Sequence, residues 1–263
     1  MSDVPRDPWK HLRARTPARI ALGRTGASLP TREVLSFALA HAQARDAVHA
    51  RLDRSALAVQ MRALGLDTVV AESEARDRAT YLRRPDLGRQ LDERSRERIK
   101  AAVRNETCDL GLMIGDGLSA TAVESHAPAL VEALLLHVNA LGLKLGPIVI
   151  AESARVALGD EVGELLGARL VAVLIGERPG LTAADSLSVY LTYLPRRGRT
   201  DAERNCISNI RPGGLAPEVA AANLAWLVKA ALAMQVTGVA LKDRSGGGLE
   251  GTIGATVLDE PGR

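Results

Sequence analysis

Four short segments of the sequence carry residue types that could bind or react with a ligand. They are residues 115–119, 152–156, 176–180 and 205–209. Three kinds of group in these segments could bind or react with a ligand: the backbone N–H groups of a glycine turn, the carboxylate of Glu177 and the thiol of Cys206. Each kind also has a simpler structural interpretation.

The glycine turn at residues 115–119 stands before a predicted helix, where backbone N–H groups can bind a phosphate. Its sequence, GDGLS, contains neither the six-position glycine pattern of dinucleotide-binding proteins nor a Walker lysine. A tight connection between a strand and a helix, without a ligand, is therefore the favoured interpretation of this segment.

The acidic, thiol and imidazole side chains do not form a recognisable catalytic or metal-binding pattern. From its own sequence context, Glu177 beside Arg178 is an ordinary ion-paired carboxylate of a loop. Cys206 has no C-x-x-C companion and no neighbouring histidine, so we expect a small, buried packing residue. The five histidines are scattered, and His41 and His49 do not have the spacing of metal ligands on a helix. The sequence thus predicts no catalytic residue and no metal site.

The elements that would position these segments follow from the apolar pattern. Short apolar runs at 110–114, 147–150, 170–175 and 188–193 predict four strands that alternate with helices, as in βαβ units. Thr121 and Glu124 form a T-x-x-E capping box at the start of one helix, and residues 216–236 predict another. We expect a Rossmann-like parallel sheet flanked by helices. Ligands of such sheets bind outside the carboxyl ends of the strands, so all four segments would lie along one rim.

The first 104 residues have a different character. Residues 1–31 are basic and interrupted by prolines, which predicts an extended arm. Thr31 is the expected N-cap of an amphipathic helix that runs to about residue 52. We therefore predict an α/β protein with two parts: a smaller, mainly helical N-terminal domain with a basic arm (1–104), and a Rossmann-like domain that ends in a tail (105–263).

Composition excludes several classes of protein. Of 263 residues, 46% are hydrophobic and 25% are charged, as in ordinary globular domains. The first hundred residues carry a net charge of +7 and the remainder −4. The basic first half offers only three widely separated aromatic residues, Trp9, Phe37 and Tyr81, as stacking platforms, which disfavours single-strand nucleic-acid binding. Two cysteines cannot build a disulfide framework, and no stretch predicts a signal peptide or a membrane span, so we expect a cytoplasmic protein.

Several segments, taken together and in order, resemble one known family. They are TPARIALGRTG (16–26), YLRRPDLGR (81–89), IGDGLS (114–119), VGELLGA (162–168), GERPGL (176–181) and CISNI (206–210). The chain from about Asp7 to Lys242 is similar to the light (small) chain of ethanolamine ammonia-lyase. The last twenty or so residues lie outside the resemblance.

The resemblance implies a subunit of an adenosylcobalamin-dependent lyase that converts ethanolamine to acetaldehyde and ammonia by a radical mechanism. In that family the heavy (large) chain binds ethanolamine, and the cobalamin is held between heavy and light chains. The light chain would orient the cofactor from one side, and the isolated chain would be inactive. Carried over residue by residue, the cobalamin contacts fall on Val156, Glu177 and Cys206.

The resemblance also bears on location and on the rival interpretations. It implies the bacterial cytoplasm, with encapsulation in an ethanolamine-utilisation microcompartment as an alternative. Because only six residues precede Asp7, we do not expect this chain to carry the targeting extension found in encapsulated relatives. The remaining alternatives are a stand-alone Rossmann-like nucleotide-binding protein and a nucleic-acid-binding accessory protein that would use the basic first half.

Overall fold

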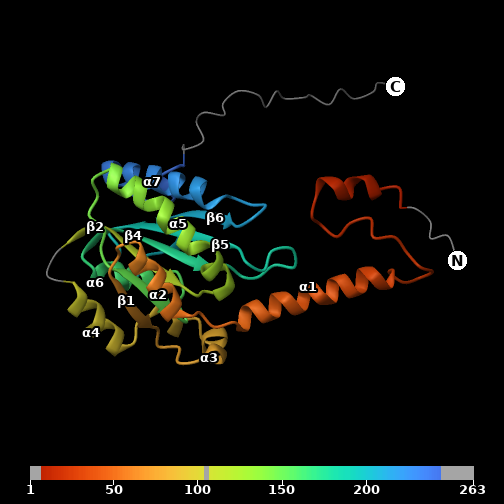
Figure 1. Ribbon diagram of the computed structural model, residues 1–263, viewed down its shortest axis with the longest axis horizontal. Coiled ribbons are helices and arrows are strands. Elements are labelled where there is room, and N and C mark those ends of the chain that lie inside the picture. Colours follow the sequence, from red (N-terminus) through yellow and green to blue (C-terminus); the bar gives the residue numbers. More distant parts are fainter. Residues whose placement is uncertain (1–6, 104–106, 244–263) are drawn as a thin grey trace, which may run out of the picture.

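The computed structural model describes residues 7–103 and 107–243, and it has an α/β architecture built on one six-stranded sheet (Figure 1). The predicted C-terminal tail lies outside the described residues. The strands are β1 (Thr68–Glu72), β2 (Cys108–Gly115), β3 (Ile148–Glu152), β4 (Ala168–Gly176), β5 (Leu187–Tyr193) and β6 (Arg204–Ile210). The helices are α1 (Thr31–His49), α2 (Arg54–Ala63), α3 (Arg78–Arg83), α4 (Glu93–Ala102), α5 (Ala120–Ala140), α6 (Leu158–Leu165) and α7 (Pro217–Met234). Short 3-10 turns are η1 (Lys10–Arg15), η2 (Leu87–Arg89), η3 (Asp201–Glu203) and η4 (Gly238–Ala240).

The strands lie in the order β1-β3-β2-β4-β5-β6. The first four in this order are parallel, which confirms the predicted parallel sheet for β2, β3 and β4. The sequence predicts β5 as a further parallel strand, but it pairs antiparallel with β4, and β6 is a second antiparallel addition at the same edge. The positions of two other strands also differ from the sequence prediction. β1 lies in the part predicted to be mainly helical, and β6 occupies residues predicted to form a loop. Because β1 pairs with β3, the sheet crosses the predicted boundary at residue 105 and is not confined to residues 105–263.

Helices cover both faces of the sheet, and successive residues of each strand point to opposite faces. Leu110 and Leu112 of β2 face a core built with α2, α5 and α7. Met113 faces a second, smaller core built with α4 and α6. Burial on both faces explains why the central strands are nearly continuous apolar runs. Figure 1 shows α5 and α7 side by side on one face, with α4 on the other.

The start of α5 differs in detail from the predicted capping box. The helix begins at Ala120, and the Ser119 hydroxyl accepts a hydrogen bond from the backbone N–H of Ala122. Ser119 therefore caps the helix in place of Thr121. The carboxylate of Glu124 accepts from the backbone N–H of Asp53, 2.8 Å away, and so ties α5 to the start of α2. Ser119, and not Thr121, is the cap because it stands directly before the first helical turn, where its side-chain oxygen reaches an unpaired backbone N–H.

The helix α1 projects from the body of the molecule, and residues 7–29 fold back beside its outer half (Figure 1). Its side chains at Glu33, Ala40 and Ala47 are the only buried ones among its residues. Pro30 occupies the N-cap position that we predicted for Thr31, and no side chain caps this end. Among the described residues, no helix is both long enough and apolar enough to span a bilayer.

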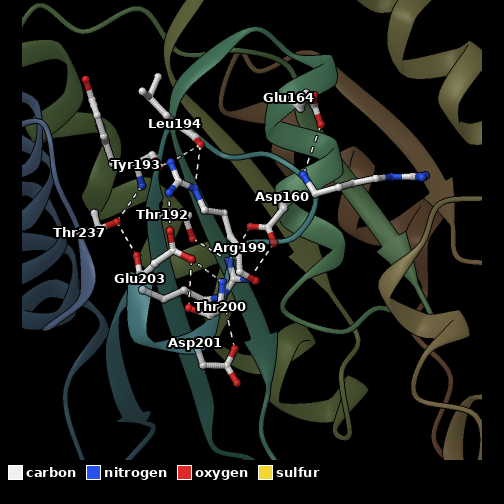
Figure 2. A network of polar contacts seen from close by, with 12 residues as sticks. Asp160, Glu164, Thr192, Tyr193, Leu194, Arg199, Thr200, Asp201, Glu203 and Thr237 are labelled. Carbon is white, nitrogen blue, oxygen red and sulfur yellow. Dashed lines mark hydrogen bonds and ion pairs between the residues drawn. The ribbon is translucent and has the colours of Figure 1, made fainter.

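A buried ion pair joins α6 to the antiparallel edge of the sheet. The guanidinium of Arg204, at the start of β6, donates two hydrogen bonds of 2.5 and 2.7 Å to the carboxylate of Asp160. Both side chains are almost completely buried. Arg204 also donates to the hydroxyl of Thr192 on β5 and to the carbonyl of Arg199. Figure 2 shows Asp160, Thr192 and Arg199 in this network. It fixes the β5–β6 connection against α6.

We expect the substitution Asp160→Ala to lower the free energy of unfolding by about 3–5 kcal/mol, because it leaves the buried Arg204 charge without its partner. Urea unfolding of the isolated chain measures this. The matched control is Asp201→Ala, since Asp201 contacts the same arginine at 3.4 Å but its side chain is 97% exposed. The control should leave the unfolding midpoint almost unchanged. Equal effects of the two substitutions would contradict the assignment of the ion pair to the core.

Candidate functional site

The candidate site lies at the carboxyl ends of β2, β3 and β4. β2 and β4 are neighbours, but the chain leaves them toward opposite edges of the sheet. From β2 it continues to β3 on one side, and from β4 it continues to β5 on the other. Open α/β sheets bind their ligands at such a switch point. Here it contains a shallow pocket of about 200 Å³. Val156 and Glu177 line it together with Tyr81, Arg155 and Tyr190.

The turn at residues 115–119 is packed against the end of β4. The backbone N–H of Leu118 donates to the carbonyl of Gly176, 3.0 Å away, and that of Ser119 donates to the carbonyl of Asp116. A Cβ atom on Gly176 would lie 2.1 Å from the carbonyl oxygen of Ser119, and Gly117 has a positive φ of 55°. Both positions therefore require glycine. Two N–H groups that a phosphate would need are already bonded, which agrees with a structural turn.

Asp116 links this turn to the loop after β3. Its buried carboxylate accepts from the backbone N–H of Ala154 at 2.9 Å and pairs with the guanidinium of Arg78 at 3.1 Å. Arg78 also donates to the carbonyls of Gly117 and Val48. Burial raises the pKa of Asp116 to about 6, although the Ala154 N–H and the Arg78 charge act in the opposite direction.

Tyr81 supports the segment that carries Val156. Its ring is buried between two guanidinium groups, with Arg155 4.2 Å and Arg78 4.8 Å from the ring centroid. Such contacts are favourable because the ring face carries negative potential. The Tyr81 hydroxyl donates to the carbonyl of Ala154, and the backbone N–H of Arg155 donates to the carbonyl of Gly88. Residues 81–88 thus hold the backbone just before Val156, which is itself half-buried.

Glu177 follows β4 and is half-buried. Its carboxylate accepts hydrogen bonds from the hydroxyl of Ser188 and from the backbone N–H of Asn209, at 3.3 Å for the latter. In the described part of the chain these neutral donors, and not Arg178, are its hydrogen-bond partners. The prediction of an ordinary ion pair with Arg178 is therefore wrong. The carboxylate instead joins the ends of three strands, β4, β5 and β6.

Cys206 is exposed, so the prediction of a buried packing cysteine is also wrong. It lies on β6 directly opposite Tyr190 of β5. The solvent-facing side of an edge strand accepts a small polar residue without loss of core packing. Desolvation of the sulfur against the sheet raises the pKa of the Cys206 thiol, and the nearby Glu177 carboxylate raises it further. The protonated thiol is therefore favoured, which does not suit a nucleophile or a metal ligand.

The structure thus brings the three predicted residues to one place. Val156 and Glu177 line the same pocket, and Cys206 is adjacent through Tyr190. Burial raises the pKa of Tyr190 to about 12, so this hydroxyl stays protonated. Sequence reasoning missed the supporting residues Tyr81 and Tyr190. Tyr81 stood within one of the family-like segments, whereas no local signal marked Tyr190. The described residues contain no cluster of three or more potential metal ligands.

Comparison with known proteins gives a family match over most of the chain. The model of the family described as "Ethanolamine ammonia-lyase light chain" matches residues 6–242. A protein of Bradyrhizobium diazoefficiens named ethanolamine ammonia-lyase small subunit is 56% identical over 260 residues, covering 98% of this chain and 99% of the relative. Proteins of the same name from Rhodopseudomonas palustris and Ralstonia nicotianae are 55% and 53% identical over 253 and 242 residues. They cover 96% and 91% of this chain, and 96% and 90% of their own lengths.

The raised pKa of Asp116 predicts a pH dependence of stability. An unfolded aspartate titrates near 3.8, so the folded chain binds more protons than the unfolded chain between about pH 4 and pH 6. Relative to the variant Asp116→Asn, the wild-type chain should lose stability as the pH rises through this window, on the order of 3 kcal/mol in total. Urea unfolding of both chains at several pH values between about 4 and 7 measures the difference. Parallel stability curves would contradict the prediction.

Proposed function

The chain belongs to the ethanolamine ammonia-lyase light chain family, and we propose on this basis that it holds one side of an adenosylcobalamin cofactor against a large subunit. It is a lyase subunit, and the activity belongs to the complex of light and heavy chains. That complex converts ethanolamine to acetaldehyde and ammonia, with ethanolamine bound by the heavy chain in the bacterial cytoplasm. The observation that carries the proposal is the family match over residues 6–242. When bound, the cofactor would supply the adenosyl radical that takes hydrogen from the substrate.

The residues of the rim suit a corrinoid in their chemistry. Corrin side chains end mostly in neutral amides, and Glu177 presents a carboxylate that accepts hydrogen bonds from such groups. Val156 offers a half-buried apolar contact beside it. Cys206 is small and exposed, so a planar ligand can approach β6 closely at this point. We propose these separate roles for Glu177, Val156 and Cys206.

The size of the pocket supports the need for a second chain. Drug-sized ligands occupy pockets of about 300–1,000 Å³, and a cobalamin is larger than such ligands. The switch-point pocket of about 200 Å³ can therefore contact only a part of the cofactor. This agrees with the proposal that the cofactor is held between two subunits, with another chain contacting the remaining surface.

The N-terminal arm and α1 offer a surface for the large subunit. The described part of the arm carries Lys10, Arg13, Arg15 and Arg19, and the side chain of Trp9 is 63% exposed. Four large apolar side chains of α1 are also exposed: Val34, Leu35, Phe37 and Leu39. Interfaces commonly combine an aromatic anchor with charged residues that steer association. We infer that this surface docks on an acidic and apolar patch of the large subunit.

Activity should appear only in the complex. We expect the pure chain to release no ammonia from ethanolamine, because the chain is the small subunit of a two-chain enzyme and the proposal places ethanolamine on the heavy chain. Addition of the large subunit and adenosylcobalamin should produce acetaldehyde and ammonia. Ammonia release by the pure chain would overturn this expectation.

Removal of residues 1–24 should weaken copurification with the large subunit while the melting temperature of the sheet domain stays unchanged. Undiminished copurification of the truncated chain at raised salt would contradict docking through the arm.

The substitutions Glu177→Gln and Cys206→Leu should both weaken cobalamin binding to the complex. The amide loses the charge assistance of the carboxylate, which costs on the order of 1 kcal/mol. The leucine should cost more, because it places a larger side chain where the corrinoid must approach. Titration of adenosylcobalamin into purified complexes measures both effects.

A matched control uses Glu164→Gln, the same chemical change on α6. This helix runs from the rim to the start of β4, so Glu164 lies near the amino-terminal ends of the parallel strands, opposite the rim. Its substitution should leave cobalamin affinity unchanged. Melting curves without cofactor should show little change for Cys206→Leu, because the residue is exposed. Unchanged affinity in both site variants would remove Glu177 and Cys206 from the site.

A further inference from the structure

The loop between β4 and β5, residues 177–186, carries Glu177 at its first position. At its base, the backbone N–H of Glu177 donates to the carbonyl of Ser186 at 2.9 Å. Its outer part has little core packing, since Arg178, Gly180 and Leu181 are exposed. Besides the hydrogen bond from the Asn209 N–H, the position of Glu177 therefore depends on contacts that hold the returning side of the loop.

Two side chains of the α5 region hold that returning side. The Ser119 hydroxyl donates to the carbonyl of Ala184 at 2.9 Å. Two turns further along the helix, Nε2 of His126 lies 3.2 Å from a carboxylate oxygen of Asp185. The His126 side chain is only 8% exposed, whereas that of Asp185 is 40% exposed. A buried imidazole on a rigid helix thus fixes a carboxylate on an otherwise exposed loop.

The contact leads directly to Glu177. Asp185 precedes Ser186, whose carbonyl accepts the Glu177 N–H. Ser188, three residues after Asp185, donates to the Glu177 carboxylate. Two of the hydrogen bonds of Glu177 are therefore made with Ser186 and Ser188, which follow Asp185 at the end of the loop and the start of β5. Neither His126 nor Asp185 lines the switch-point pocket.

We propose that His126 and Asp185 are positioning residues, which hold the 177–186 loop on α5 and so orient Glu177 toward the corrinoid. The inference rests on the proposed function, because it requires Glu177 to contact the cofactor. It adds two residues that act through another side chain and not by touching the ligand.

The test titrates adenosylcobalamin into the complex of light and large subunits. Asp185→Ala should weaken cofactor affinity about fivefold, with the melting temperature of the complex nearly unchanged because Asp185 is partly exposed. Asp185→Asn keeps an oxygen that can accept from His126, and it should restore most of the affinity. The matched control is Asp109→Ala, which removes a carboxylate paired with Arg169 at the start of β2, away from the rim.

A double variant separates positioning from a general structural effect. If Asp185 acts only through Glu177, Asp185→Ala should cause no further loss of affinity in the Glu177→Gln background. Equal losses in both backgrounds, a matching fall in melting temperature, or wild-type affinity of Asp185→Ala would each overturn the positioning role. If Glu177→Gln itself binds cobalamin as tightly as the wild type, the proposed Glu177 contact fails, and the positioning role fails with it. Weak binding by Glu177→Gln with normal binding by Asp185→Ala overturns the positioning role alone.

Discussion

The ion pair between Arg78 and Asp116 is the interaction on which the rim of the sheet depends. Asp116 directly follows β2, and its carboxylate accepts a hydrogen bond from the backbone N–H of Ala154 after β3. Arg78 pairs with this carboxylate and donates to the carbonyls of Gly117 and Val48. One guanidinium and one carboxylate therefore connect the ends of two strands with α3 and the end of α1. Both side chains are shielded from water, so truncation of either leaves buried polar groups of the other without a hydrogen-bond partner. The burial that raises the pKa of Asp116 is a consequence of this position.

From this pair, support extends to both sides of the candidate site. The guanidinium groups of Arg78 and Arg155 both pack on the ring of Tyr81. The Tyr81 hydroxyl donates to the carbonyl of Ala154 and so holds the backbone before Val156. On the far side, Glu177 is held by hydrogen bonds from β5 and β6. The resulting surface is shallow, and hydrogen bonds support it from both sides. Such a surface agrees with the proposal that this chain holds one side of a cofactor.

The body and the N-terminal projection have different physical characters. The body buries most of its apolar residues on the two faces of the sheet, and its buried ion pairs include Arg78–Asp116 and Arg204–Asp160. The arm and α1 leave large apolar side chains and basic residues in solvent. A helix with so little burial gains little stability from packing within this chain, which is the reason for the proposal that α1 docks on the large subunit. The loop at residues 177–186 connects the two parts, since Arg19 of the arm donates to the carbonyl of Leu181.

The sequence by itself determined the parallel core of the sheet, the closing helix α7 and the family, because continuous apolar runs, helical periodicity and ordered motifs are local properties. It also indicated the rim residues Val156, Glu177 and Cys206, through the resemblance. Only the tertiary structure decided that β1 and β6 join the sheet. β1 has five residues, and β6 (RNCISNI) is mostly polar because one of its sides faces solvent, so neither has the pattern of a buried strand. The partners of Asp116, Asp160 and Glu177 lie tens of residues away in the sequence. Which distant groups meet depends on strand order and crossover connections, and no local pattern encodes these.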